Sequence, residues 1–371
     1  MAQTSFPLAT GHGSKIVWSR LVWKDARDQM FINKFFGGSD SVINRVTELT
    51  KQERGESVRF QLVADLIGDG TIGDNEREMN EESLQNYVDN ITIDLIANQV
   101  KNTGKLSDQK SIFDFRSLAR EKLAYWLANR LDQLAFLTLS GIDYSYNNDG
   151  STRTDSAFAN LGFSSDVSAP TSNRHYRVTA DASGVYTGLE AGATASVDAT
   201  DTLSYKAVVD ACVKAQRNYM PPLSSGGQDK YVAFISPEGY AQLKKDDDFQ
   251  RAVTSGGSRG SDNPWFTGGI QTVDGVVFHP HRLVFNTLGA ASGSKWGSGS
   301  TVDGSRMLLC GRQALGMIDL GPPEWNEKTF QYGTQQGISV DKMFGMKKPK
   351  FYNVNTGQDE DFGVMAIDHA I

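Results

Sequence analysis

Residues 56–100 read ESVRFQLVADLIGDGTIGDNEREMNEESLQNYVDNITIDLIANQV, and this stretch is the most informative part of the chain. Apolar and polar side chains alternate in both of its arms, with the apolar ones at Val58, Phe60, Leu62, Ile91, Ile93 and Leu95. A period of two is typical of half-buried strands. The segment between the arms, Asp65 to Glu76, is dense in Gly and Asp, which favour turns. The sequence therefore predicts two strands joined by a long acidic excursion.

The length and charge of this excursion indicate a partner outside its own domain. Long connections without structure of their own are uncommon in compact domains and are usually binding loops or disordered segments. Residues 56–100 contain 10 acidic and 2 basic residues, whereas the whole chain has a net charge of −7. Residues 1–34 contain 5 basic and 2 acidic residues. A basic arm and an acidic loop can pair between copies of one chain, and two solvated faces are the equally weighted alternative. The acidic balance argues against a general nucleic-acid binder.

Composition limits the class of protein and its compartment. The 371 residues are 39% hydrophobic and 22% charged, which is typical of globular proteins. No apolar run reaches the roughly 20 residues that a membrane helix needs, and the first ten residues do not have the pattern of a signal peptide. Cys212 and Cys310 lie in apolar surroundings, so we expect buried thiols in a reducing compartment rather than the alternative, a disulfide.

Several helices and strands are predicted from local patterns. Ser14 is a candidate cap for a helix over residues 15–24, and the aromatic residues at 31–36 have to be buried against the chain itself or a neighbour. An apolar stripe predicts a helix over 108–140 that begins at Ser107 or Asp108 and ends at Gly141.

The second half alternates helices and strands without a regular rhythm. A loop-rich segment at 142–200 precedes a helix that starts at Thr202 and ends before Pro221 and Pro222. A buried strand at 231–235 leads to a helix capped by Ser236, a polar exit at 244–248, and strands near 275–279, 307–310 and 363–367. The fold class is therefore α+β.

The motifs for chemistry are weak. Residues 65–76 resemble a calcium loop, but Ile67 stands where a ligand is needed and the flanks are strand-like. His279 and His281 have no third ligand at a recognised spacing, and residues 254–260 are better explained as a flexible loop than as an anion site. No catalytic set is recognisable, so we expect no enzyme activity, no cofactor and no metal.

The order of these parts carries a family resemblance. The chain runs from an aromatic arm through an acidic hairpin and a long helix to an α+β half that contains Tyr231-Val232-Ala233-Phe234-Ile235-Ser236-Pro237-Glu238-Gly239-Tyr240. This order resembles the major capsid proteins of tailed bacteriophages, with the Hong Kong 97-type (HK97-like) fold, and most closely the branch named for the podovirus N-four. The most telling stretches are 31–37, 56–60, 234–237, 275–278 and 362–367.

The resemblance implies a division into domains. Residues 1–50 would be the N-terminal arm and residues 51–101 the extended loop. Residues 102–200 would be the peripheral domain, with a spine helix at 108–140 and a surface insertion at 142–200. Residues 201–320 would be the axial domain, and residues 321–371 would return to the peripheral domain.

The resemblance also implies contacts between subunits. In the extended loop the candidate contact residues are Asp65, Asp69, Asp74, Glu76, Arg77, Glu78, Glu81 and Glu82. In the N-terminal arm they are Trp18, Arg20, Trp23, Lys24, Arg27 and Phe31. Some relatives form covalent Lys–Asn links from a lysine in the extended loop, but residues 56–100 contain no lysine. We therefore expect a shell held by non-covalent contacts.

The implied function is a major capsid protein that self-assembles from hexamers and pentamers into an icosahedral shell around double-stranded DNA, without sequence-specific binding and without a membrane. The implied partners are separate scaffolding, portal and decoration or cement proteins, and the implied location is the virion capsid, assembled in the bacterial cytoplasm. An encapsulin-type compartment is one alternative. A secreted β-rich hydrolase or adhesin is an alternative of another class.

Overall fold

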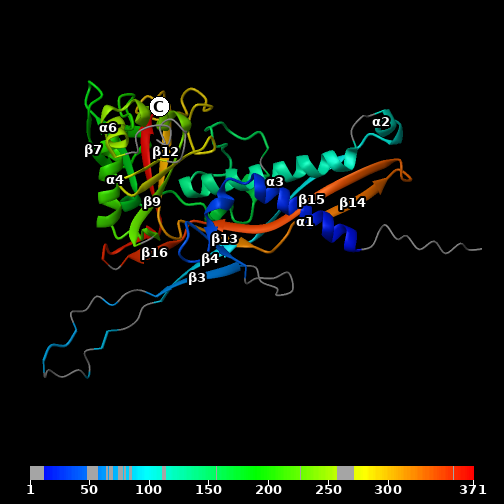
Figure 1. Ribbon diagram of the computed structural model, residues 1–371, viewed down its shortest axis with the longest axis horizontal. Helices are drawn as coiled ribbons and strands as arrows, with labels where there is room; N and C mark the ends of the chain where they lie inside the picture. Colours follow the sequence, from blue (N-terminus) through cyan, green and yellow to red (C-terminus); the bar gives the residue numbers. More distant parts are fainter. Residues whose placement is uncertain are drawn as a thin grey trace, which may run out of the picture.

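The computed structural model describes residues 12–47, 57–63, 66, 70–73, 78, 81–82, 86–110, 114–155, 157–225, 227–256, 271–353 and 355–371. Two sheets lie side by side along the long axis of the molecule, and a hairpin projects from the region between them (Figure 1). Among the described residues, none of the helices has both the length and the apolar character needed to cross a membrane.

The first sheet has six strands in the order β1–β2–β13–β15–β14, with β5 also paired to β15. They are β1 (Phe36–Gly37), β2 (Ile43–Val46), β5 (Asp94–Lys101), β13 (Leu315–Asp319), β14 (Glu324–Phe330) and β15 (Gln335–Lys347). The helix α1 (His12–Gln29) packs along α3 (Phe115–Ser140) and β14, and α3 packs on β15 (Figure 1). The N-terminal helix is predicted correctly, but Ser14 lies inside α1 rather than capping it.

The second sheet has eight strands in the order β10–β11–β9–β12–β18–β6–β7, with β8 also paired to β9. They are β6 (His175–Ala180), β7 (Tyr186–Ala191), β8 (Leu223–Ser225), β9 (Gln228–Ile235), β10 (Gln271–Val273), β11 (Val276–Pro280), β12 (Gly304–Cys310) and β18 (Val364–Ala370). The helices of this half are α4 (Tyr205–Arg217), α5 (Pro237–Lys245) and α6 (Asp247–Gly256).

The central strands of the second sheet are buried on both faces. In β9, Val232 and Phe234 join the core that contains α3, whereas Tyr231, Ala233 and Ile235 join the core under α4 and α6. Because both faces are covered, such strands have continuous apolar runs rather than alternation. The prediction of a buried strand at 231–235 is therefore confirmed, as are the strands near 275–279, 307–310 and 363–367.

The helix α3 is shorter than predicted. Asp114, rather than Ser107 or Asp108, caps it by accepting a hydrogen bond from the Ser117 amide at 2.9 Å. Residues 105–110 form a separate helix, α2 (Lys105–Lys110), and residues 111–113 lie outside the described residues. The predicted end at Gly141 is confirmed, since this residue has a φ of 65° and its amide donates to Thr138 and Leu137. A 26-residue helix is about 39 Å long at 1.5 Å per residue.

Two details of the following helices differ from the prediction. The helix α4 is preceded by Ser204 rather than Thr202, because Thr202 forms a bridge to Ala370. The predicted polar exit at 244–248 instead contains a helix junction: α5 ends at Lys245, and Asp246 accepts from the Asp248 and Gln250 amides at the start of α6. The predicted cap at Ser236 is confirmed, since its Oγ accepts from the Gly239 amide.

The strand pairing joins segments that the sequence assigned to different domains. The segment 142–200 contributes two strands to the eight-stranded sheet, where β6 is paired parallel to β18 and β7 is paired to β6. The C-terminal strand β18 also belongs to this sheet, antiparallel to β12, rather than returning to the other half. Strand order depends on hydrogen bonds between residues far apart in the chain, which local patterns do not specify.

Short elements and the cysteines complete the fold. The 3₁₀ helices are η1 (Ile32–Phe35), η2 (Phe158–Asn160), η3 (Ser164–Asp166), η4 (Ser172–Arg174) and η5 (Thr194–Ser196). Two antiparallel hairpins stand outside the sheets, β3 (Ser57–Val63) with β4 (Asn86–Thr92) and β16 (Lys350–Asn353) with β17 (Gln358–Asp361).

Cys212 and Cys310 are both free and buried, as predicted, and burial raises the pKa of the Cys212 thiol to about 12.

Candidate intersubunit surface

The arms of the acidic excursion form the β3–β4 hairpin. The register pairs Val58 with Ile91 and Leu62 with Tyr87, so the two alternating segments face each other as predicted. The predicted second arm is divided between two strands. Ile91 ends in the hairpin, whereas Leu95 belongs to β5 and pairs with Met343 of β15. The chain therefore leaves the body and returns to it at the edge of the six-stranded sheet.

One face of β4 anchors the hairpin to the body. Ile91 is buried against Ile318 and Phe351, and the rings of Tyr87 and Tyr352 lie 5.7 Å apart. The carboxylate of Asp89 lies 2.6 Å from Lys347 Nζ. These contacts fix the root of the hairpin.

A glycine allows the close approach at this root. A Cβ on Gly345 of β15 would lie 2.2 Å from the carbonyl oxygen of Thr92. Real Cβ atoms do not come so close to backbone, so a larger residue would push β4 away from β15. Gly345 therefore fits the crossing of the hairpin over the sheet.

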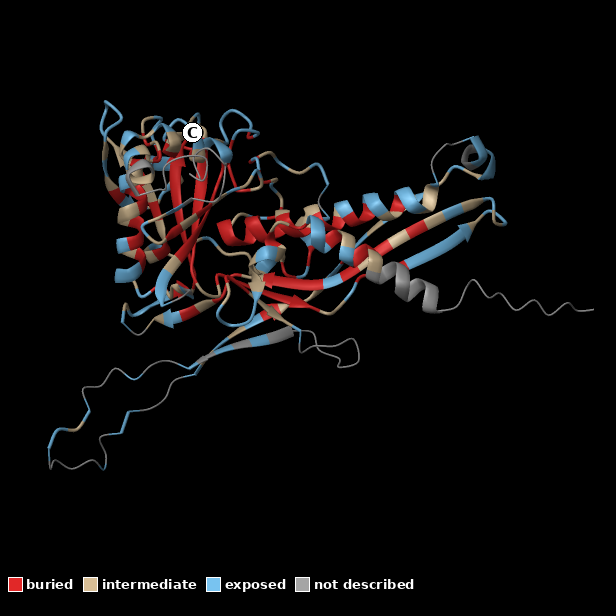
Figure 2. Ribbon diagram, viewed as in Figure 1, coloured by how far each residue is buried: buried red, intermediate tan, exposed pale blue. Residues whose placement is uncertain are grey.

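The other face of the hairpin is exposed. The described part of β3 beyond its root is coloured as exposed in Figure 2. Val63 is 59% exposed, Val88 is 47% exposed, and Leu66, just beyond β3, is 58% exposed. The hairpin and the described residues beyond it point away from both sheets (Figure 1). Exposed apolar side chains that gather on a projecting element mark a surface for interaction.

Most of the predicted contact residues of the extended loop lie outside the described residues, namely Asp65, Asp69, Asp74, Glu76 and Arg77. Glu78, Glu81 and Glu82 are exposed. Most of the calcium-like segment 65–76 also lies outside the described residues. Within the described part of the chain, no three His, Cys, Asp or Glu side chains are arranged to hold a metal ion.

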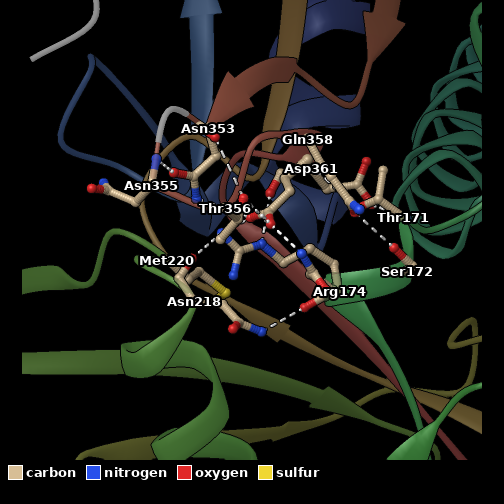
Figure 3. A network of polar contacts seen from close by, with 12 residues as sticks. Thr171, Ser172, Arg174, Asn218, Met220, Asn353, Asn355, Thr356, Gln358 and Asp361 are labelled. Atoms are coloured by element: carbon tan, nitrogen blue, oxygen red, sulfur yellow. Dashed lines mark hydrogen bonds and ion pairs between the residues drawn. The ribbon is translucent and has the colours of Figure 1, made fainter.

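A buried polar network joins the β16–β17 hairpin to η4 and to the end of α4 (Figure 3). Arg174, at the end of η4, donates from Nε to the Asp361 carbonyl at 3.0 Å and from Nη2 to the Asn218 carbonyl at 2.8 Å. The same guanidinium lies 3.1 Å from Glu360, and Lys348 lies 2.9 Å from the Asp361 carboxylate. Burial lowers the pKa of Arg174 and Lys348, and the neighbouring carboxylates oppose this effect. The network holds the β16–β17 hairpin, on which Tyr87 packs.

A second ion cluster lies under α1. Arg45 and Lys342 both pair with the Asp319 carboxylate, and Lys342 is 1% exposed. The Lys342 Nζ also lies 4.1 Å from the centre of the Trp23 ring, within the range of a cation–π contact. The cluster connects α1, β2, β13 and β15.

The predicted contact residues of the N-terminal arm have different positions. Lys24 and Arg27 are exposed on α1, and the side chains of Trp18 and Arg20 lie outside what the structure describes. Trp23 is 9% exposed and belongs to the core of its own chain. The ring packs inside the chain because the apolar stripe of α1 faces α3, and a contact of Trp23 with a neighbour stays a prediction.

Phe31 is also held mainly within its own chain. Its ring stacks on His281 at 4.1 Å and lies 6.1 Å from the ring of Phe136. The backbone amides of Phe31 and Ile32 donate to the two carboxylate oxygens of Asp132 at 2.9 and 3.1 Å. Aromatic stacking on His281 explains the predicted histidine pair better than a metal site does. Burial lowers the pKa of His281 to about 4.

Sequence reasoning missed the charged residues that hold this region together. Asp132 is 5% exposed, and burial raises the pKa of its carboxyl to about 6 against the opposing effect of the two amide donors. An acidic residue within the apolar stripe of a helix is a local sign, visible in the sequence, of a buried carboxylate. No such local sign marks Arg174 and Lys342, since their partners come from other segments.

Comparison with known proteins decides the family. The family model described as phage capsid protein matches residues 15–371. The chain belongs to the phage capsid protein family. The major capsid protein of Pseudomonas phage KPP25 is 43% identical over 367 residues, which are 98% of this chain and 96% of that protein.

Solved structures agree with this family. The capsid of Ralstonia phage GP4 is 27% identical with a TM-score of 0.75, over 100% of this chain and 95% of that one. The capsid of cyanophage Pam1 is 18% identical with a TM-score of 0.71, over 100% and 94%, and it supports the fold alone.

The expected HK97-like fold and the expected function are confirmed: the chain is a phage major capsid protein, a structural subunit of the virion shell. The encapsulin alternative and the hydrolase or adhesin alternative have no support among these similarities.

Proposed function

We propose that this capsid subunit builds an icosahedral head through non-covalent contacts in which the extended loop, residues 51–101, lies over a neighbouring subunit. The observation that carries the proposal is the projecting β3–β4 hairpin, whose outer face exposes Val63 and Val88 among polar side chains and leads to exposed Leu66. An isolated two-stranded hairpin is marginally stable in water, so a neighbour that covers this face would stabilise it. The absence of lysine from residues 56–100 supports contacts without covalent links.

The two sheets supply the proposed domain roles. The six-stranded sheet with α1 and α3 would be the peripheral domain, and α3 would be its spine. The eight-stranded sheet with α4, α5 and α6 would be the axial domain around the five-fold and six-fold centres. Under this assignment β6, β7 and β18 are axial, and the remaining loops of 142–200 lie at the outer surface or a capsomer boundary.

The N-terminal arm, residues 1–50, would make the second contact. Lys24 and Arg27 are exposed on α1 and carry positive charge, which suits the acidic loop of another copy. Trp18 and Arg20 remain candidates for the same contact. Asp25 pairs with Arg120 at 2.8 Å within the chain, whereas exposed Asp28 on the same helix offsets part of this positive charge.

Hexamers and pentamers of this chain would form in the host cytoplasm with separate scaffolding, portal and decoration or cement proteins. The shell would enclose double-stranded DNA without reading its sequence, and the chain would have no catalytic activity.

Deleting residues 65–82 tests the central proposal. The variant should keep the circular dichroism spectrum and the melting temperature of the monomer, because the deleted residues lie beyond the paired strands. Negative-stain electron microscopy should show no closed particles. Particles of normal size would contradict the proposal, and loss of monomer folding would show that the loop belongs to its own core.

A further inference from the structure

A cavity of about 410 Å³ lies between α3, the strand β5 and the segment around Phe158. Trp126 and Arg130 line it from α3, and Arg153 and Phe158 line it from the segment that follows. Leu95, which is 45% exposed, lines it from β5. The contact surfaces proposed above do not include this cavity.

Two arginines share one aromatic ring in this cavity. Arg153 Cζ lies 5.0 Å and Arg130 Cζ 5.8 Å from the centre of the Phe158 ring. Their hydrogen bonds go to neutral groups: Arg153 Nε donates to the Tyr146 carbonyl at 3.0 Å, and Arg130 Nη1 donates to Gln133 Oε1 at 2.5 Å. Arg153 Nη2 is buried without a hydrogen-bond partner among the described residues.

The nearby carboxylates do not neutralise these arginines. Asp149 Oδ1 accepts from the amide and the hydroxyl of Ser151, and Asp155 Oδ1 accepts from the Ala157 amide. Within the described part of the chain, neither guanidinium lies within ion-pair distance of a carboxylate. Burial first, and then the charge of Arg130, lower the pKa of Arg153, and the charge of Asp149 opposes these effects only in part. A carboxylate from outside would relieve both effects.

The wall formed by β5 is the edge of a sheet. In the described residues β5 pairs with β15 alone. The amides of Leu95 and Gln99 donate to the side chains of Asp94 and Asn98, the preceding residues, rather than to another strand. An unpaired edge can accept an extended segment of another chain.

We propose that this cavity receives carboxylate side chains from the acidic segment 65–82 of a second copy, which lies along the free edge of β5. This inference rests on the proposed function, because it names the surface that the extended loop would cover. Residues 65–82 contain seven acidic residues and one basic residue, Arg77. The hairpin of the same chain points away from α3 (Figure 1), so the segment comes from a neighbour. The basic N-terminal arm has the wrong charge for two arginines.

A crosslinking experiment tests the contact. One preparation carries Asp155→Cys and another carries Glu78→Cys, and the two are co-assembled and oxidised. The native thiols do not interfere, because Cys212 and Cys310 are buried. We expect a disulfide-linked dimer on a non-reducing gel. The control pair, Asp181→Cys with Glu78→Cys, should give no dimer, since Asp181 lies in the β6–β7 turn of the other sheet.

Charge reversal tests the electrostatics. The variant R130E/R153E should lower the yield of particles by about tenfold or more, which corresponds to about 1.4 kcal/mol, and its melting temperature as a monomer should change little. Combination with D74K/E76K/E78K should restore assembly. The control K122E/R217E makes the same charge change at exposed positions on α3 and α4 and should assemble normally.

The outcomes distinguish a failure of the cavity contact from a failure of the proposed role of the extended loop. If R130E/R153E assembles like the parent chain and no dimer forms, while the 65–82 deletion still blocks assembly, the cavity is not the acceptor and the proposed function stands. If the deletion also assembles, the proposed function itself fails. If R130E/R153E gives normal empty shells that do not retain DNA, the arginines bind phosphate and the inference is overturned.

Discussion

Replacing Asp132 with asparagine tests how the segment after α1 is fastened to the spine helix α3. The carboxylate accepts the amides of Phe31 and Ile32 through its two oxygens, in a site where it is 5% exposed. Asparagine keeps one accepting oxygen and removes the charge. The variant therefore lacks one acceptor, which lowers the unfolding free energy by about 1–3 kcal/mol. It also avoids burying a charged carboxylate, which acts in the opposite direction.

The pH dependence gives a sharper magnitude. Burial raises the pKa of Asp132 from 3.8 to about 6, so the folded state binds the proton more tightly than the unfolded state. The neutral carboxyl contributes stability that is fully present below pH 3.8 and is lost as the pH rises through about 6. With these two pKa values, proton linkage raises the unfolding free energy of the parent chain by about 1.3 kcal/mol when the pH is lowered from 7 to 5. The asparagine variant has no such gain.

The assay is urea denaturation of the unassembled subunit at both pH values, followed by circular dichroism. The difference in unfolding free energy between the parent and D132N should move by about 1.3 kcal/mol in favour of the parent at pH 5. A control, D359N, changes an exposed aspartate and should show no such movement. A parent–D132N difference that is equal at both pH values would refute the assignment of a raised pKa to this carboxyl.

Three further predictions follow from buried contacts. Gly304→Ala should destabilise the subunit by about 1–3 kcal/mol through overpacking, because the added Cβ would lie 1.9 Å from the Trp296 ring. The control is Gly38→Ala, where the added Cβ meets open space. Equal urea midpoints for the two variants would contradict the prediction of overpacking. Asp368→Asn should lower the unfolding free energy by about 3–5 kcal/mol, because it leaves buried Arg306 without its ion pair. Burial raises the pKa of Asp368, but Arg306 and His175 lower it to about 2. The stability that the pair contributes is therefore present above pH 3.8 and should be lost as the pH falls towards 2, which an acid titration of the unfolding free energy measures. Neither cysteine should react with a thiol reagent before unfolding, since burial raises the pKa of both thiols; rapid labelling of the native subunit would show that one of them is accessible.

Features with a local cause were predicted from the sequence. Ser236 followed by Pro237 is sufficient to start α5, because a side-chain cap and a fixed φ act within one turn. Gly141 ends α3 for a similar local reason. The missed junction at Asp246 shows the limit of this reasoning, since its polar run is equally compatible with a loop.

The candidate surface was predicted only in part. The two arms of the hairpin follow from the alternation around Val58 and Ile91, whereas their register comes from the structure, because alternation fixes only which side chains share a face. The inward position of Trp23 does not, because an apolar residue on a helix can face its own core or a neighbour with the same local pattern. The cavity with Arg130 and Arg153 combines segments whose proximity depends on the packing of α3 against β5.

The sequence by itself determined the arms of the hairpin, the strands near 231–235, 275–279, 307–310 and 363–367, most of the helices, the charge of the extended loop and the absence of lysine from it. Each of these depends on residues close together in the chain. The tertiary structure alone decided the strand order and the ionic contacts. Asp132 meets Phe31 across 101 positions, and Arg174 meets Asp361 across 187. Their carboxylate and guanidinium groups are stable in the interior only when such distant partners neutralise or hydrogen-bond them, and no local pattern specifies where those partners come from.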